Sequence, residues 1–156
     1  MQRVLPADSY HKNFLIAKMR QFFGDGERII IVTEKESKGK EEEMDVLTAI
    51  YTYKENILTV RLNGEIDHHS AREVRGEIDR QILYYKPREV ILDLGQVGFM
   101  DSSGLGLIMG RYNRITELGG VLKLGNPGRN AVRMLKMSGA DKLIPIIKGD
   151  GGGNQS

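Results

Sequence analysis

Cysteine and tryptophan are absent from this 156-residue sequence, and aromatic residues make up only 6% of it. Without cysteine the chain can form neither a disulfide framework nor a thiolate metal site, which fits a cytosolic protein. No apolar run approaches the roughly 18–20 residues that a transmembrane helix needs. We expect no secretory signal either, because Lys12, Lys18 and Arg20 interrupt the one apolar cluster near the N-terminus. We therefore expect a soluble cytoplasmic protein.

An excess of either charge is lacking as well, since 23 lysines and arginines nearly balance 21 aspartates and glutamates. The net charge of +2 requires neither nucleic acid nor an anionic membrane as a partner. Histidine is limited to His11, His68 and His69, and the adjacent pair points in different directions with no third ligand nearby in the sequence. We expect no metal site, no cofactor, and surface or capping roles for His68 and His69, which could make binding pH-sensitive.

Residues 1–43 differ in character from the rest of the chain. Asn13–Phe23 could form a short helix and Arg28–Thr33 a strand, neither with an evident partner, and residues 34–43 form a mixed charged run typical of a solvated linker. We expect a flexible N-terminal extension or an upstream mis-start. The second hypothesis rests on Met44, because the Lys and Glu codons before it are purine-rich, as a bacterial ribosome-binding site is.

Residues 44–148 alternate between strand and helix patterns, which predicts one α/β domain with a mixed sheet and helices packed against it. An antiparallel hairpin, Thr48–Tyr53 with Ile57–Leu62, is expected to open the domain, and Asn63-Gly64 to break its second strand. The glycine-rich tail at residues 149–156 is expected to be disordered. The other expected strands are Glu89–Leu94, apolar enough to be covered on both faces, Val121–Leu124, and a final strand or helical turn at Leu143–Ile147.

Three helices are expected between these strands. The first begins with a capping box formed by Ser70 and Glu73, the second spans about Ser102–Leu118, and the third runs from Asn126 as N-cap to about Met137. The residues of the first helix expected to face the core are Ala71, Val74, Ile78, Ile82 and Tyr85.

The start of the second helix carries the most chemistry. It follows a buried strand through an expected loop at residues 95–101, and at such a start several backbone N–H groups lack partners and the helix dipole is positive. Asp101 is well placed as N-cap, and Ser102 and Ser103 would lie in the first turn with their hydroxyls near solvent. These residues fit a simple cap, but they also fit a modification site.

A phosphate on Ser103 would add about −1.5 to −2 charges at this helix start. The helix N-terminus would tolerate that charge, whereas a partner with a carboxylate or apolar group there would not, and Asp67 and Asp101 would add repulsion. Gly104 and Gly106 remove bulk and would let a partner approach closely. Phosphorylation could therefore release a partner without refolding the domain.

The rest of the second helix offers a candidate binding surface. One apolar face is expected in the core, and the remainder near Ser103 could form a partner-binding patch. Arg111 and Arg114 could contact acidic groups of a partner or lie on a solvated face. The apolar residues concerned are Leu105, Leu107, Ile108 and Met109.

Motifs for catalysis or nucleotide binding are incomplete. A G-x-S-x-G elbow is excluded because Met100 and Asp101 stand where its first glycine is needed, and no histidine follows the serines. The glycines of Gly104–Gly110 are spaced G-x-G-x-x-x-G, which is not the dinucleotide fingerprint, and no G-K-[ST] is present. We therefore expect that the protein is not an enzyme.

Several separated motifs resemble one family. Asp101–Gly106 resembles the signature of the STAS domains of bacterial anti-sigma factor antagonists, and Gly64–Ser70 resembles their G-E-[LI]-D-H-H loop. Gly110-Arg111-Tyr112 and Met137-Ser138-Gly139 resemble the sporulation branch. The resemblance covers about Met44–Ile147. The head has no counterpart in the family's short form, and the part after Met137 looks abbreviated.

The resemblance implies a STAS fold and a phosphoprotein that regulates transcription in the cytoplasm. In this family the unphosphorylated antagonist binds a serine-kinase anti-sigma factor and releases the sigma factor. The kinase phosphorylates the second serine of Asp-Ser-Ser, here Ser103, and a serine phosphatase restores the antagonist. Neither direct nucleic-acid binding nor membrane binding is implied.

The resemblance also implies which residues meet the partner. Asp67 is expected beside Ser103, and the partner-binding set is Asp67, His68, Asp101, Ser102, Gly104, Leu105 and Gly106. Two alternatives remain open, a STAS regulator of a general stress pathway with another kinase, and a small nucleotide-binding protein.

Overall fold

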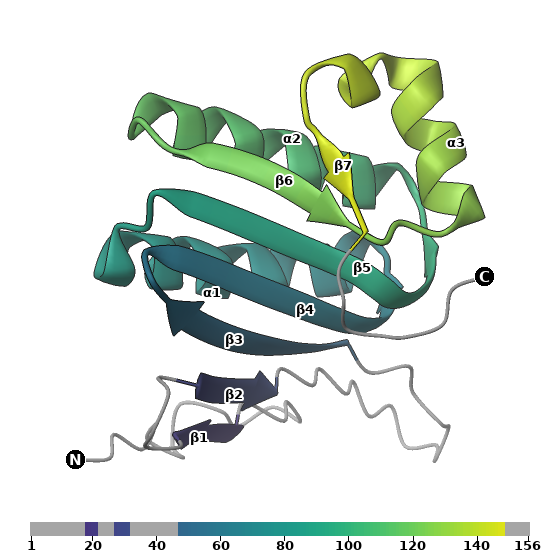
Figure 1. Cartoon of the computed structure of the whole chain (residues 1–156). Coiled ribbons are helices and arrows are strands. Elements are labelled where there is room, and N and C mark those ends of the chain that lie inside the picture. The colour runs from purple at the N-terminus through teal and green to yellow at the C-terminus, as the bar shows by residue number, and fades with distance from the viewer. Residues whose placement is uncertain (1–17, 22–26, 32–46, 149–156) are drawn as a thin grey trace, which may run out of the picture.

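A computed structural model of the chain describes residues 18–21, 27–31 and 47–148 (Figure 1). Within them seven strands form one sheet, in the same order as in the sequence. The strands are β1 (Lys18–Gln21), β2 (Glu27–Ile31), β3 (Thr48–Lys54), β4 (Ile57–Ile66), β5 (Glu89–Met100), β6 (Val121–Gly125) and β7 (Ile146–Ile147). The helices are α1 (His68–Tyr85), α2 (Ser102–Glu117), α3 (Arg129–Ser138) and a short 3-10 helix, η2 (Ala140–Lys142).

The sheet is mixed, as predicted. β1 to β4 pair antiparallel, and β4 to β7 pair parallel. Parallel neighbours need crossover connections, and α1 and α2 provide the first two. In Figure 1 these helices lie side by side behind the sheet, while α3 stands at the end where β5 and β6 finish. No helix of the described residues has both the length and the apolar character needed to cross a membrane.

The core lies between the sheet and the helices α1 and α2. In α1 the predicted core residues Ala71, Val74, Ile78 and Ile82 are buried, whereas Tyr85 is partly buried and stacks on Tyr53 at 4.2 Å between ring centroids. In β5 alternate residues are buried, namely Val90, Leu92 and Leu94. The prediction that this strand is covered on both faces is wrong, because α1 and α2 pack on the same face (Figure 1).

Two strands are longer than the sequence indicated. β4 continues through Asn63-Gly64 to Ile66, and β5 continues through the expected loop at residues 95–101 as far as Met100. Register shifts between Arg61 and Asn63 and between Gly64 and Glu65 let the two strands stay paired. The predicted strand ends are wrong, because a β-bulge accommodates an extra residue in one strand and the two strands stay paired beyond it. The carboxyl ends of β4 and β5, Ile66 and Met100, therefore lie next to each other at one end of the sheet.

The N-terminal head also differs from expectation. Lys18–Gln21 is a strand, so a helix over Asn13–Phe23 is wrong there, and the remainder of that range lies outside the described residues. β2 matches the strand expected at Arg28–Thr33, and it has partners after all, because it pairs with β1 and with the edge of β3. The charged run, Met44 and the tail also lie outside the described residues. The mis-start hypothesis and the division at residue 44 therefore stay predictions.

The third helix begins later than predicted. Asn126 adopts a left-handed conformation (φ 48°) and is no N-cap, while Gly128 precedes the helix without a side-chain cap. The Asn126 amide donates instead to Asp93 Oδ1 at 3.4 Å, which ties this turn to β5. Gly139 ends α3 with φ 84°, as a helix C-cap requires. The final element predicted at Leu143–Ile147 is a strand, β7, and the helical turn η2 lies just before that range.

Candidate functional site

Two helix starts meet at one edge of the sheet. Ile66 ends β4 and Met100 ends β5, and the two residues are register partners. The Asp101 N–H donates to the Ile66 carbonyl at 3.2 Å. Asp67 and Asp101, the residues that follow these strand ends, therefore come together although they are far apart in the sequence.

Asp101 caps α2 as predicted. Its Oδ1 accepts from the Ser103 N–H at 2.7 Å, and its carbonyl accepts from the Gly104 N–H at 2.9 Å. Ser102 is exposed and Ser103 is partly buried in the first helical turn. Within the described part of the chain the Ser103 hydroxyl has no hydrogen-bond partner. Modification of this hydroxyl would therefore break no hydrogen bond among the described residues.

Asp67 caps α1 in the same way. Its Oδ1 accepts from the N–H groups of His69 at 3.1 Å and Ser70 at 3.0 Å, and its own N–H donates to Ser70 Oγ at 3.0 Å. The capping box therefore joins Asp67 to Ser70, and the predicted box of Ser70 with Glu73 is wrong because β4 delivers an equally good cap three residues earlier. The hydrogen bond from the Ser70 N–H holds the pKa of Asp67 below its usual value, against the opposing effect of partial burial.

The two histidines belong to the first turn of α1. His68 and His69 are exposed, and their rings meet edge to face with centroids 5.6 Å apart. In the described ranges no three histidine, cysteine, aspartate or glutamate side chains are grouped to hold a metal ion. His68 thus flanks Asp67 at the surface.

The glycines of the signature have different surroundings. Gly104 is buried, and an added Cβ would lie 2.8 Å from Met100 Sδ and 2.9 Å from Met100 Cβ. Its small size serves internal packing, which corrects the expectation that it makes room for a partner. Gly106 is exposed, with nothing within 4 Å of an added Cβ, and Leu105 is partly buried against the core. Of the two glycines, only Gly106 leaves the open space that was predicted for a partner.

An ion pair that the sequence did not reveal joins α1 to α2. Arg111 Nε lies 3.0 Å from Asp79 Oδ1, and their side chains are only 6% and 19% exposed. Arg114 Nη2 lies 3.8 Å from Asp79 Oδ2. Burial lowers the pKa of Arg111, and Asp79 opposes that effect. Arg111 therefore neither lies on a solvated face nor reaches a partner, since it holds the two helices together.

Asn130 is a second residue that the sequence did not single out. Its Oδ1 accepts from the Met100 N–H at 3.1 Å, so the first turn of α3 is attached to the end of β5, next to Asp101. Phe99 precedes this point and is 46% exposed. No sequence pattern marked Asn130, because its partner is a backbone group 30 residues away.

Residues 49–149 match the family model for the STAS domain. The chain belongs to the STAS domain family. The match confirms the predicted fold, an α/β domain with a mixed sheet, an opening antiparallel hairpin and helices packed against it. It begins within β3, so β1 and β2 lie outside the matched STAS domain.

Two named relatives of this STAS protein are antagonists. An anti-sigma F factor antagonist of Paenibacillus polymyxa is 42% identical over 90 residues, which cover 58% of this chain and 77% of that protein. An anti-sigma-B factor antagonist of Bacillus subtilis is 33% identical over 99 residues, which cover 63% of this chain and 89% of that protein.

A solved relative exists in two states. Unphosphorylated SpoIIAA, an anti-sigma factor antagonist, matches with a TM-score of 0.55 and 28% identity over 61% of this chain and 81% of that chain. Phosphorylated SpoIIAA from Bacillus matches with a TM-score of 0.55 and 26% identity over 69% of this chain and 93% of that chain. The resemblance drawn from the sequence motifs is confirmed.

The two glycines allow a matched test. Gly104→Ala is expected to lower the free energy of unfolding by about 1–3 kcal/mol, because Met100 is fully buried and cannot move aside. Gly106→Ala is expected to raise it by roughly 0.5–1 kcal/mol, since alanine favours the helix and meets no neighbour. Urea denaturation of both variants provides the measurement. Equal stabilities would contradict the packing role of Gly104.

Acid should weaken the cap formed by Asp67. Because its pKa is lowered on folding, its stabilising contribution is present above the unfolded carboxyl pKa of about 3.9 and is lost as pH falls through the lowered folded value. Asp67→Asn keeps a cap oxygen without the charge, so its urea midpoint should fall less than that of the wild type between about pH 5 and pH 3. Parallel profiles would show that the Asp67 charge contributes nothing.

Proposed function

We propose that this STAS protein is an anti-sigma factor antagonist and not an enzyme. Its unphosphorylated form binds an anti-sigma factor in the cytoplasm and so releases the sigma factor. The observation that carries the proposal is Ser103 in the first turn of α2, whose hydroxyl has no partner among the described residues, in a chain similar to two anti-sigma factor antagonists. A relative solved in phosphorylated and unphosphorylated forms supports control by phosphorylation.

Ser103 is the proposed switch, with a serine-kinase anti-sigma factor as the enzyme that phosphorylates it and a serine phosphatase as the enzyme that restores it. Asp101 Oδ1 already occupies the Ser103 N–H at 2.7 Å, so a phosphate would add its charge next to a carboxylate. Asp67 brings a second carboxylate to the same edge of the sheet. The added charge is therefore presented to the partner, and release needs no change of fold.

The proposed contact surface surrounds this serine. It consists of Asp67, His68, Asp101, Ser102, Leu105 and Gly106, with Gly104 supporting it from within. Asp67 and Asp101 give this surface a negative charge, and Gly106 leaves space for a partner to come close.

The sporulation and stress branches are two candidate pathways. The anti-sigma F factor antagonist has the higher sequence identity to this chain, which favours the sporulation branch. The anti-sigma-B factor antagonist is matched over more of its own length, which favours the stress branch. A small nucleotide-binding protein remains the alternative of another class. Equilibrium dialysis with ATP distinguishes it, since we expect no tight binding by the isolated chain.

The test is mass spectrometry after incubation with ATP and a kinase-type anti-sigma factor from the same organism. We expect one added phosphate, located on Ser103 by peptide analysis, and none on Ser103→Ala. The unphosphorylated protein should release the sigma factor from the anti-sigma factor, and the phosphorylated protein should not. No binding of that anti-sigma factor by the unmodified protein would overturn the proposal.

A further inference from the structure

Helix α3 carries a stripe of positive charge. Arg129, Arg133 and Lys136 are all exposed and spaced i, i+4, i+7, so they share one face over about 10 Å of helix. Ala131 and Leu135 point the opposite way into the core. The helix contains no acidic residue.

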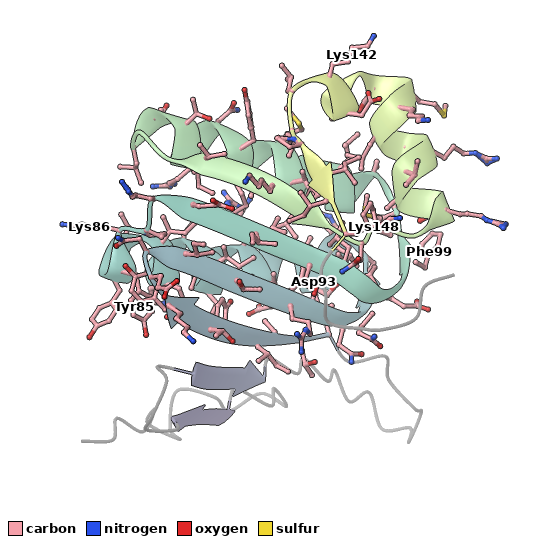
Figure 2. All side chains as sticks on the ribbon, in the orientation of Figure 1. Tyr85, Lys86, Asp93, Phe99, Lys142 and Lys148 are labelled. Atoms are coloured by element: carbon pink, nitrogen blue, oxygen red, sulfur yellow. The ribbon has the colours of Figure 1, made fainter. Side chains whose placement is uncertain are left out.

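The three cations have no counter-ion among the residues that the structure describes. Among the described residues, every ion pair uses other arginines and lysines, and no carboxylate lies within ion-pair distance of Arg129, Arg133 or Lys136. Figure 2 shows nitrogen-tipped side chains that project from α3 away from the sheet. Within the described part of the chain, the charge of the stripe is therefore uncompensated.

The stripe begins beside the Ser103 turn. The bond from Met100 N–H to Asn130 Oδ1 fixes the first turn of α3 against the residue that precedes Asp101. Arg129 and Arg133, with Pro127, Asn130 and Val132, line an open hollow of about 670 Å³. A partner seated on the Ser103 turn would have this basic hollow within reach.

We infer that the α3 stripe is a second part of the docking surface, and that it binds an acidic surface of the anti-sigma factor. The inference rests on the proposed function. A protein partner fits better than nucleic acid, because Asp67 and Asp101 at the adjoining edge would repel a phosphate backbone. Binding thus requires a partner that is acidic opposite α3 and tolerates carboxylates opposite α2.

Charges at such a position act mainly on the rate of association. Complementary charge steers diffusional encounter, and the effect disappears as salt screens it. The stripe should therefore speed binding at low salt and leave the dissociation rate nearly unchanged. Phosphorylation of Ser103 would act on the other part of the surface.

The experiment measures association rates with the kinase-type anti-sigma factor for Arg129→Gln/Arg133→Gln. The matched control is Lys54→Gln/Arg88→Gln, which removes two exposed cations at the opposite edge of the sheet. At about 25 mM salt we expect the stripe variant to associate about tenfold more slowly and the control within twofold of wild type. The difference should vanish near 0.5 M salt.

The possible outcomes test the inference and the proposed function separately. Stripe and control variants with equal rates, while the wild type binds, would overturn the inference and leave the proposed function intact. A wild type that binds no such anti-sigma factor would overturn both. Fluorescence anisotropy with a duplex DNA of about 20 base pairs serves as a counter-test, because stripe-dependent DNA binding would assign the cations to nucleic acid instead.

Discussion

Replacing Ser103 with alanine is expected to give an antagonist that binds its anti-sigma factor as the wild type does and remains bound after ATP is added. The hydroxyl makes no hydrogen bond within the described residues, and Asp101 caps the Ser103 N–H whatever the side chain, so the fold should not change. In the wild type, phosphorylation adds about −1.5 to −2 charges beside Asp101. Like charges at an interface cost several kcal/mol, so wild-type affinity should fall about 100-fold or more.

Ser103→Asp should bind with intermediate affinity. One carboxylate adds a single negative charge, whereas a phosphate adds up to about twice that. Ser102→Ala is the matched control, because Ser102 is the exposed neighbour on the same turn and should still permit phosphorylation and release. Isothermal titration of each variant before and after kinase treatment gives the affinities. If Ser103→Asp bound as tightly as wild type, charge repulsion at this turn would not be the switch.

Removing the charge of Asp79 is expected to destabilise the domain strongly. Asp79→Asn leaves Arg111 charged, 6% exposed and without its counter-ion. Breaking one side of a buried pair in this way costs about 3 kcal/mol. Arg114, whose closest carboxylate is also Asp79, adds to the uncompensated positive charge. The free energy of unfolding, measured with urea at pH 7, should fall accordingly.

A second substitution should restore most of that stability. Arg111→Met keeps an unbranched apolar chain in the space of the arginine stem and removes the charge. Replacing both members of a buried pair with neutral groups is often close to neutral, so Asp79→Asn/Arg111→Met should lie within about 1 kcal/mol of wild type. A double variant as unstable as the sum of the single variants would mean that the pair does not couple α1 to α2.

Local chemistry was readable from the sequence because it depends on neighbours along the chain. Asp101 followed by two serines predicts a helix cap, and the observed bond joins residues only two apart. The hairpin and the apolar face of α1 follow from periods of two and of about 3.6 residues. The prediction failed where two local signals competed. Ser70 has Asp67 three residues before it and Glu73 three residues after it, and either acid could form a capping box with it, but the observed box uses Asp67.

By itself, the sequence determined the alternation of strands and helices, the capped serine at the start of α2, and the family. Only the tertiary structure decided what those elements meet. Bulges extend β4 and β5 to a common edge, which brings Asp67 beside Asp101. Packing buries Arg111 against Asp79, and the hydrogen bond between Met100 and Asn130 attaches the first turn of α3 to the residue that precedes Asp101. The physical reason is the same in each case, since periodicity tells which face of an element is apolar but not which distant residue will lie against it.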